Sequence, residues 1–148
     1  MIIMAVDYGK SRTGLAICDK KEILPFPIGI IEEKNIEILC EKIKEKIAEN
    51  KAELVVIGLP KNMDGTLGES AKNAKELGEK LKSLININLE FWGERKTTVT
   101  AHEYLNQTNT RGKKIKSIID AVSATIILQN YLDYRNKKIN NQSGNYNY

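Results

Sequence analysis

The chain has 148 residues, of which 41% are hydrophobic and 28% charged, so it can bury a core as a single domain without disulfides or a structural metal. Its formal net charge of +4 permits a polyanionic partner but does not require one. One histidine and two cysteines without CxxC spacing exclude a Cys/His zinc site, and no segment reaches the length of a membrane span.

The first predicted element is a strand that ends in a carboxylate. Residues 2–6 form an apolar run without polar alternation, which is typical of a strand buried on both faces, and Asp7 follows it directly. Burying an unpaired charge is very costly, so Asp7 is expected on the rim of the sheet, where a metal ion or a substrate can meet it. The alternative is a simple turn residue, because Asp followed closely by Gly is common in hairpins.

The rest of the chain alternates between strand and helix patterns. Further strands are predicted at 13–18, 22–31, 54–57 and 85–92, and helices at 35–50, 70–85, 97–106 and 117–135. Pro25 and Pro27 place the third strand at a sheet edge, and Ser70 can cap the second helix. Cys18 and Cys40 fall on apolar positions and are expected to pack as small hydrophobes.

The order of these elements predicts where a site would lie. Helical crossovers make the first, fourth and fifth strands parallel, and the first three strands form an antiparallel meander. In open sheets of this type, ligands bind at the carboxyl ends of the parallel strands. Asp7, the loop after Pro60 and Glu94 all lie at such ends, so three distant stretches converge on one rim.

Four motifs in the same order resemble the YqgF family, whose members are bacterial Holliday-junction resolvase-like nucleases, also described as nucleases that mature the small-subunit ribosomal RNA precursor. They are DYGKSRTG at 7–14, GLPKNMDGTLG at 58–68, ERKTT at 94–98 and DAVSATIILQNYLD at 120–133. The resemblance implies an RNase H-like α/β fold, with a five-stranded mixed sheet of order 3-2-1-4-5, an antiparallel second strand and flanking helices. We expect one such domain over residues 1–135 and a disordered, Asn-rich tail over 136–148.

The resemblance also implies a metal-dependent catalytic centre. Asp7, Glu94 and Asp120 would be both the catalytic residues and the ligands of Mg²⁺ or Mn²⁺, hard cations that take oxygen ligands. Viewed alone, Asp120 is equally explained as an acid in the first turn of a helix, where it suits the helix dipole. The sequence departs from the family at Gly93, where an acidic residue usually precedes the glutamate.

Several polar residues near the predicted rim are candidates for contacts with nucleic acid. These are Lys10, Arg12, Asn62, Asp64, Arg95, Lys113 and Lys114. Each has a simpler reading as well: surface charge for the basic residues and a tight turn for the Asn-Met-Asp-Gly segment. Trp92 either packs in the core or stacks on a base.

We therefore predict a nuclease that hydrolyses phosphodiester bonds in structured nucleic acid, in maturation of the 16S ribosomal RNA precursor. The alternatives are a Holliday-junction resolvase acting on branched DNA and a non-catalytic nucleic-acid-binding module, which Gly93 favours. The lack of a signal-peptide pattern predicts a cytoplasmic protein. RNA or DNA as substrate, endo- or exonucleolytic cleavage, and a monomer or a homodimer all stay open.

Overall fold

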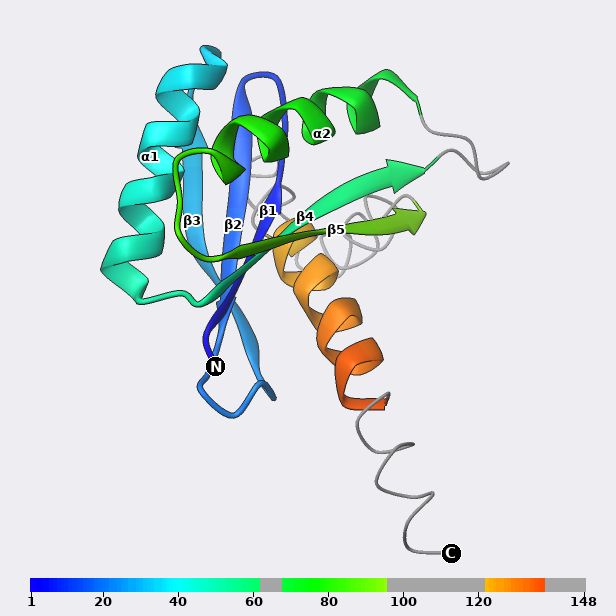
Figure 1. Ribbon diagram of the computed structural model, residues 1–148. Helices are drawn as coiled ribbons and strands as arrows, with labels where there is room; N and C mark the ends of the chain where they lie inside the picture. The colour runs from blue at the N-terminus through cyan, green and yellow to red at the C-terminus, as the bar shows by residue number, and fades with distance from the viewer. Residues whose placement is uncertain (62–67, 96–121, 138–148) are drawn as a thin grey trace, which may run out of the picture.

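The protein is a mixed β-sheet with helices on both faces. A computed structural model describes residues 1–61, 68–95 and 122–137, which contain five strands and three helices (Figure 1). The labelled elements are β1 (Ile3–Asp7), β2 (Arg12–Cys18), β3 (Pro25–Glu32), α1 (Ile36–Asn50), β4 (Leu54–Lys61), α2 (Glu69–Lys82) and β5 (Asn88–Arg95). The third helix covers residues 122–137 and is called the C-terminal helix below.

The order of strands across the sheet is β3-β2-β1-β4-β5, as predicted. β1 pairs antiparallel with β2 and parallel with β4, and β4 pairs parallel with β5. β1 therefore lies in the middle of the sheet. Because β1, β4 and β5 are parallel, their carboxyl ends lie at the same end of the sheet, which is called the rim below.

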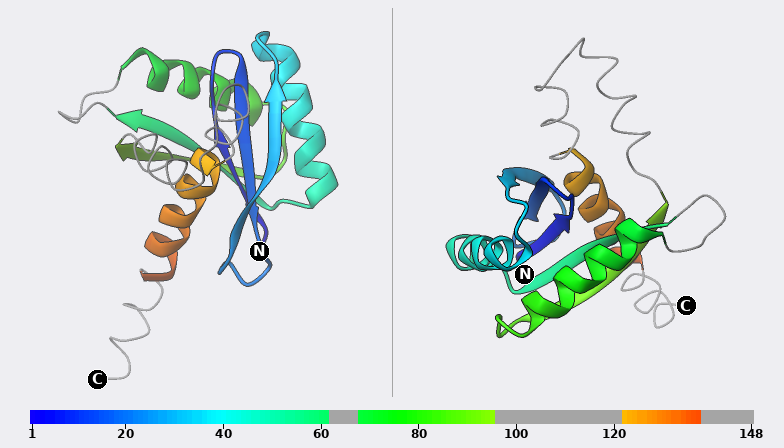
Figure 2. Two further views of the ribbon diagram at one scale, coloured as in Figure 1. Left: turned by 180° about the vertical axis from the view of Figure 1, so that it is seen from behind. Right: turned by 90° about the horizontal axis from the view of Figure 1, so that it is seen from above.

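β1 is apolar throughout because both of its faces are covered. Met4 and Val6 pack in a cluster with α1 and α2, whereas Ile3 and Ala5 pack in a second cluster with the C-terminal helix. Figure 2, viewed from above, shows α1 and α2 on one side of the sheet and the C-terminal helix on the other. Strand side chains alternate between faces, so Asp7 follows Ile3 and Ala5 onto the face of the C-terminal helix.

Three predicted boundaries were wrong. β4 continues through Gly58 and Pro60 to Lys61 instead of ending at residue 57, because β5 pairs with it along that whole length. β5 correspondingly runs over Asn88–Arg95, not 85–92. The N-cap of α2 is Gly68, not Ser70, because Ser70 already lies within the helix.

The last helix was predicted to end at about Arg135 and runs two residues further. The C-terminal helix continues through residue 137, and Asn136 is held there by donating a hydrogen bond from Nδ2 to the backbone oxygen of Glu22 over 3.0 Å. Among the described helices, none combines the length and the apolar character needed to cross a membrane.

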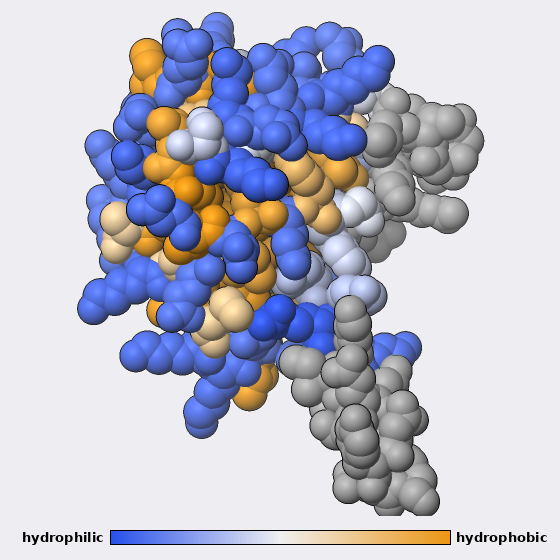
Figure 3. All heavy atoms as spheres, in the orientation of Figure 1, coloured by the Kyte–Doolittle hydropathy of each residue, from blue (hydrophilic) through white to orange (hydrophobic). Residues whose placement is uncertain are grey.

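The surface over α1 and α2 is mostly hydrophilic, with apolar side chains gathered where the two helices meet (Figure 3). A hollow of about 380 Å³ lies there, lined in part by Ile38, Cys40 and Leu84. Cys40 is buried and reduced, as predicted, and so is Cys18 on β2. This hollow lies on the face of the sheet opposite to Asp7.

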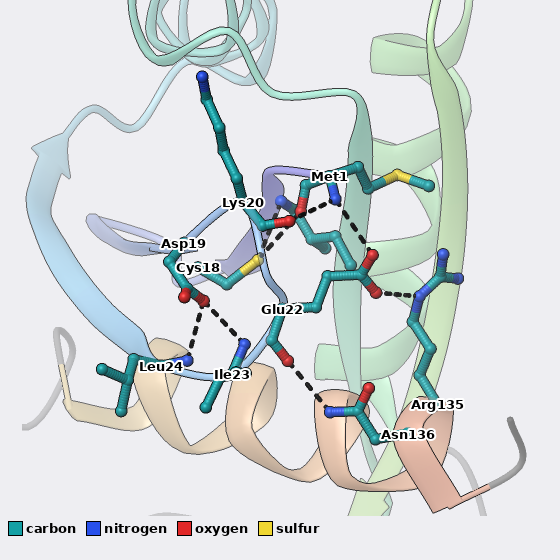
Figure 4. A network of polar contacts seen from close by, with 10 residues as sticks. Met1, Cys18, Asp19, Lys20, Glu22, Ile23, Leu24, Arg135 and Asn136 are labelled. Atoms are coloured by element: carbon teal, nitrogen blue, oxygen red, sulfur yellow. Dashed lines mark hydrogen bonds and ion pairs between the residues drawn. The ribbon is translucent and has the colours of Figure 1, made fainter. Parts of the chain in front are cut away.

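A polar network fastens the far end of the C-terminal helix to the turn between β2 and β3 (Figure 4). The Glu22 carboxylate accepts hydrogen bonds from Arg135 Nε and, over 3.1 Å, from the N-terminal ammonium group of Met1. Glu22 has a left-handed backbone with φ of 59°. Burial alone would raise the pKa of Glu22, but the bonds from Arg135 and the ammonium group outweigh it and hold this pKa below its ordinary value.

Replacing Glu22 by Gln should lower the free energy of unfolding at pH 7 by about 1–2 kcal/mol, because a charge-assisted hydrogen bond is lost at a partly buried site. The low native pKa means that the unfolded state takes up the proton first as the pH falls. The difference between wild type and Glu22→Gln should therefore disappear as the pH falls through the native pKa of Glu22. Urea unfolding at pH 7 and at acidic pH checks this, and a gap that stays constant with pH would contradict it.

Candidate active site

Asp7 is the last residue of β1 and is half-buried at the carboxyl end of this central strand. Its partner across the antiparallel pair is Gly14 on β2. On the other side, Gly58 follows Ile57, which is the register partner of Val6 on β4. Both strands that flank Asp7 therefore carry glycine at its level, so neither contributes a side chain at that position.

Gly58 also lets the C-terminal helix approach the sheet beside Asp7. A Cβ atom on Gly58 would lie 2.6 Å from Cδ1 and 3.3 Å from Cγ1 of Ile127. Ile127 is buried, so its side chain fills the space that the glycine leaves. The identity of residue 58 thus sets how closely this helix packs over β4 at the level of Asp7.

A double-mutant cycle tests this contact. Gly58→Ala alone should force Ile127 out of its position, whereas Ile127→Val alone leaves a small cavity that costs about 0.5–1.5 kcal/mol. Ile127→Val shortens the branch that a new methyl at position 58 would meet, so the double variant should be more stable than the sum of the singles by about 1 kcal/mol. Chemical unfolding of the four proteins measures the coupling. Additive effects would mean that the two side chains do not compete for the same space.

For the other two predicted carboxylates, the structure describes only the backbone of Glu94 and does not describe Asp120. The backbone of Glu94 lies near the carboxyl end of β5, in register with Pro60 on β4, so its position on the predicted rim agrees with the topology. Asp120 lies outside the described residues, two positions before the first described residue of the C-terminal helix. Within the described part of the chain, no group of three or more His, Cys, Asp or Glu side chains is arranged to hold a metal ion.

Four of the predicted nucleic-acid contacts also lie outside the described residues: Asn62, Asp64, Lys113 and Lys114. Arg95 is described only as the register partner of Lys61 at the end of β5. For these five residues the functional assignment stays a prediction.

The two basic residues of the β1–β2 turn are described. Lys10 is exposed, and Arg12 is half-buried with its Nε 3.6 Å from Glu32 Oε1. Arg12 Nη1 is buried and has no hydrogen-bond partner within the described structure. Arg12 lines a hollow of about 420 Å³ together with Ser11, Lys34 and the acidic residues Glu32 and Glu33. A buried guanidinium N–H without an acceptor is costly, and because Nη1 is buried, a phosphate would meet Arg12 through the other nitrogens of its guanidinium.

Beside this rim lies an aromatic cluster that the strand pattern left undecided. The centroid of the Trp92 ring lies 5.6 Å from that of the Tyr131 ring, in an edge-on arrangement, and 5.1 Å from that of the Tyr134 ring. The Tyr131 hydroxyl donates a hydrogen bond to Glu90. Burial, followed by that bond, raises the pKa of Tyr131 to about 12, so the hydroxyl remains a donor at neutral pH.

Glu90 and Tyr131 were not foreseen as partners because 41 residues separate them. The available signal was the alternation of β5, which places polar Glu90 and amphipathic Trp92 on the face opposite to Leu89 and Phe91. That pattern identifies the face, but not what covers it.

The comparisons with known proteins agree with this architecture. Residues 1–134 match the family described as "RuvX: Holliday junction resolvase". A Clostridium botulinum protein named "Putative pre-16S rRNA nuclease" is 42% identical over 133 residues, covering 90% of this chain and 97% of its own. A protein of the same name from Halothermothrix orenii is 39% identical over 137 residues, covering 93% of this chain and 98% of its own.

Solved structures give the fold independently of sequence. Thermus thermophilus RuvC in complex with a Holliday junction substrate superposes with a TM-score of 0.56 at 10% identity, covering 91% of this chain and 95% of that one. Fowlpox virus resolvase in complex with Holliday junction DNA superposes with a TM-score of 0.52 at 15% identity, covering 90% and 98%. The predicted RNase H-like fold is therefore confirmed. With a family match that covers residues 1–134 and curated relatives matched along nearly their whole length, the chain belongs to the RuvX (YqgF) family.

Proposed function

We propose that this protein is a metal-dependent nuclease that cleaves phosphodiester bonds in the 16S ribosomal RNA precursor. The observation that carries the proposal is the position of Asp7, half-buried at the carboxyl end of the central strand between two glycine positions. A carboxylate in such a place is suited to hold a cation against a phosphate, and the relatives at 42% and 39% identity carry the name of a pre-16S rRNA nuclease.

The oxygen donors fit Mg²⁺ or Mn²⁺, because Asp7 offers a hard carboxylate ligand and the chain supplies two further acids in the same motif set, Glu94 and Asp120. Such ions, when bound, activate water and neutralise charge on the leaving oxygen. Asp7 would hold the metal from the middle strand, and Glu94 from the carboxyl end of β5. Asp120 would complete the site from the segment before the C-terminal helix.

The basic residues of the β1–β2 turn would hold the substrate. Arg12 is half-buried and lines the hollow beside the turn, so its guanidinium can meet a backbone phosphate there. Lys10 is exposed beside it and would add charge attraction without reading sequence. Arg95, Asn62, Asp64, Lys113 and Lys114 are further candidates for contacts along the strand. The enzyme would act in the cytoplasm, as a domain spanning residues 1–135.

The second candidate function is cleavage of Holliday junctions. It is favoured by the description of the family as a Holliday junction resolvase. The same carboxylates would serve it, because phosphodiester hydrolysis in RNA and in DNA needs the same activated water and the same charge neutralisation.

A cleavage panel separates these functions. The purified chain is incubated with Mn²⁺ or Mg²⁺ and with a 16S precursor fragment, a four-way DNA junction or a linear single strand, and the cleavage positions are mapped. We expect cuts in the precursor RNA that EDTA abolishes. Cleavage of the junction alone would favour the second function. Equal cleavage with and without a divalent metal would overturn the metal-dependent assignment, and no cleavage of any substrate would favour a non-catalytic binding module.

A further inference from the structure

We propose that Trp92 and Tyr134 form a stacking platform for an unpaired base of the nucleic-acid strand that enters the site. The inference deepens the proposed function, on which it rests, by adding a binding subsite for single-stranded nucleotides. It would make the protein prefer a substrate with an unpaired segment on the strand that leads to the cleavage position.

Trp92 lies on the same face and at the same level of the sheet as Asp7, and Tyr134 meets it from the part of the C-terminal helix whose end is fastened to the β2–β3 turn. Trp92 is the register partner of Gly58, which follows the partner of Val6. Two strand spacings of about 4.8 Å therefore separate the rows of Asp7 and Trp92, so their backbones lie about 10 Å apart. Trp92 packs in the cluster of the C-terminal helix, on the face to which alternation also assigns Asp7.

Within this cluster, Trp92 is held in place by a buried ring, and Tyr134 is exposed. Tyr131 is buried, holds the Trp92 ring edge-on and is itself anchored by its bond to Glu90. Tyr134 lies one turn further along the helix, with its ring tilted by 47° to that of Trp92, and is 51% exposed. A ring that only pinned the helix to β5 would bury most of its area, whereas this one leaves half of it facing solvent.

The charges around the platform point to stacking and not to phosphate binding. Arg135 is paired with Glu22, and Asp133 accepts a hydrogen bond from Gln129 over 2.9 Å. Glu90 already accepts the Tyr131 hydroxyl. Arg135 is thus engaged by Glu22, and the carboxylates of Glu90 and Asp133 do not bind a phosphate, so the aromatic ring is what these residues leave for contact, and every base has a face that can stack on it.

Trp92 is the only tryptophan of the chain, so its fluorescence reports directly on this surface. The purified protein in EDTA, where cleavage does not proceed, is titrated with a ten-residue oligouridine and with a blunt-ended RNA duplex, and anisotropy of labelled oligouridine gives the affinity. We expect saturable quenching by the single strand and much less by the duplex. Stacking of one base contributes about 1–3 kcal/mol, so Tyr134→Ala should weaken binding by roughly 5- to 150-fold.

Three variants separate stacking from packing. Tyr134→Phe keeps the ring and should bind within about twofold of wild type, whereas Tyr134→Leu keeps apolar contact with Trp92 but has no aromatic face and should bind as weakly as Tyr134→Ala. Phe26→Ala is the matched control, because Phe26 is 43% exposed on β3 at the other edge of the sheet. The loss caused by Tyr134→Ala should be the same at low and high salt, since no phosphate contact is removed.

Wild-type affinity for oligouridine in Tyr134→Ala, recovery of affinity in Tyr134→Leu, or equal quenching by duplex and single strand would each overturn the platform. These outcomes leave the nuclease assignment untouched if metal-dependent cleavage is observed. Conversely, Tyr134-dependent binding in EDTA without any cleavage would support the platform and count against the catalytic proposal.

Discussion

Asp7→Asn is expected to abolish cleavage while leaving the fold intact. The amide has nearly the shape of the carboxylate but lacks its charge and one of its acceptor oxygens, so it is a poor ligand for Mg²⁺ or Mn²⁺. Loss of a direct ligand should exceed the roughly 10–100-fold that loss of an outer-shell partner costs. Asp7 is half-buried at the rim and not enclosed in the core, so the melting temperature should change little.

Two measurements on the same protein make this prediction specific. Single-turnover cleavage should fall to background, and calorimetric titration with Mn²⁺ should show weakened binding. Asp133→Asn serves as the matched control, because it makes the same chemical change at an exposed position of the C-terminal helix. If Asp7→Asn cleaves as fast as the wild type and binds Mn²⁺ equally well, Asp7 is a turn residue and the proposed centre is wrong.

The central part of the fold could be predicted from the sequence because burial on both faces leaves a local signature. The run at residues 2–6 is apolar throughout, and β1 indeed packs against helices on both sides. The helix of residues 35–50 was equally predictable, since Leu39, Cys40 and Ile43 recur on one face and are buried. The position of Asp7 at the end of β1 follows from these two patterns and the topology.

What could not be predicted depends on contacts between distant segments. The bond between Glu22 and Arg135 joins residues 113 apart, and neither residue carries a local pattern that indicates the other. The extension of β4 to Lys61 comes from pairing with β5, which outweighs the turn preference of Gly58 and Pro60. Ser70 is a favoured capping residue by type, but the helix begins earlier at Glu69.

The candidate site also has features that the sequence predicts and features that only the structure shows. Residue type and spacing single out Asp7, Glu94 and Asp120 through the family motifs, but only the structure shows that glycines flank Asp7 on both neighbouring strands. The Trp92–Tyr134 platform depends on how the C-terminal helix crosses β5. A one-dimensional pattern does not contain that crossing.

Gly9→Ala should disrupt the turn that carries the candidate site. A Cβ atom on Gly9 would lie 2.2 Å from the backbone oxygen of Arg12, a distance that real Cβ atoms essentially never show. The clashing atom belongs to the backbone, so no rotation of a side chain can relieve the contact, and the β1–β2 turn has to open. The free energy of unfolding should fall by about 2–3 kcal/mol.

The same change should remove most cleavage activity, because the turn fixes Asp7 relative to Arg12 across a single tight connection. Ser11→Ala is the matched control, since it alters the same turn without adding an atom near the backbone. Its free energy of unfolding should lie within about 0.5 kcal/mol of the wild-type value. Urea unfolding and cleavage of the precursor RNA are measured on both variants. Wild-type stability in Gly9→Ala would show that the turn accommodates a side chain. Lost stability with full activity would show instead that cleavage does not depend on how this turn holds Asp7.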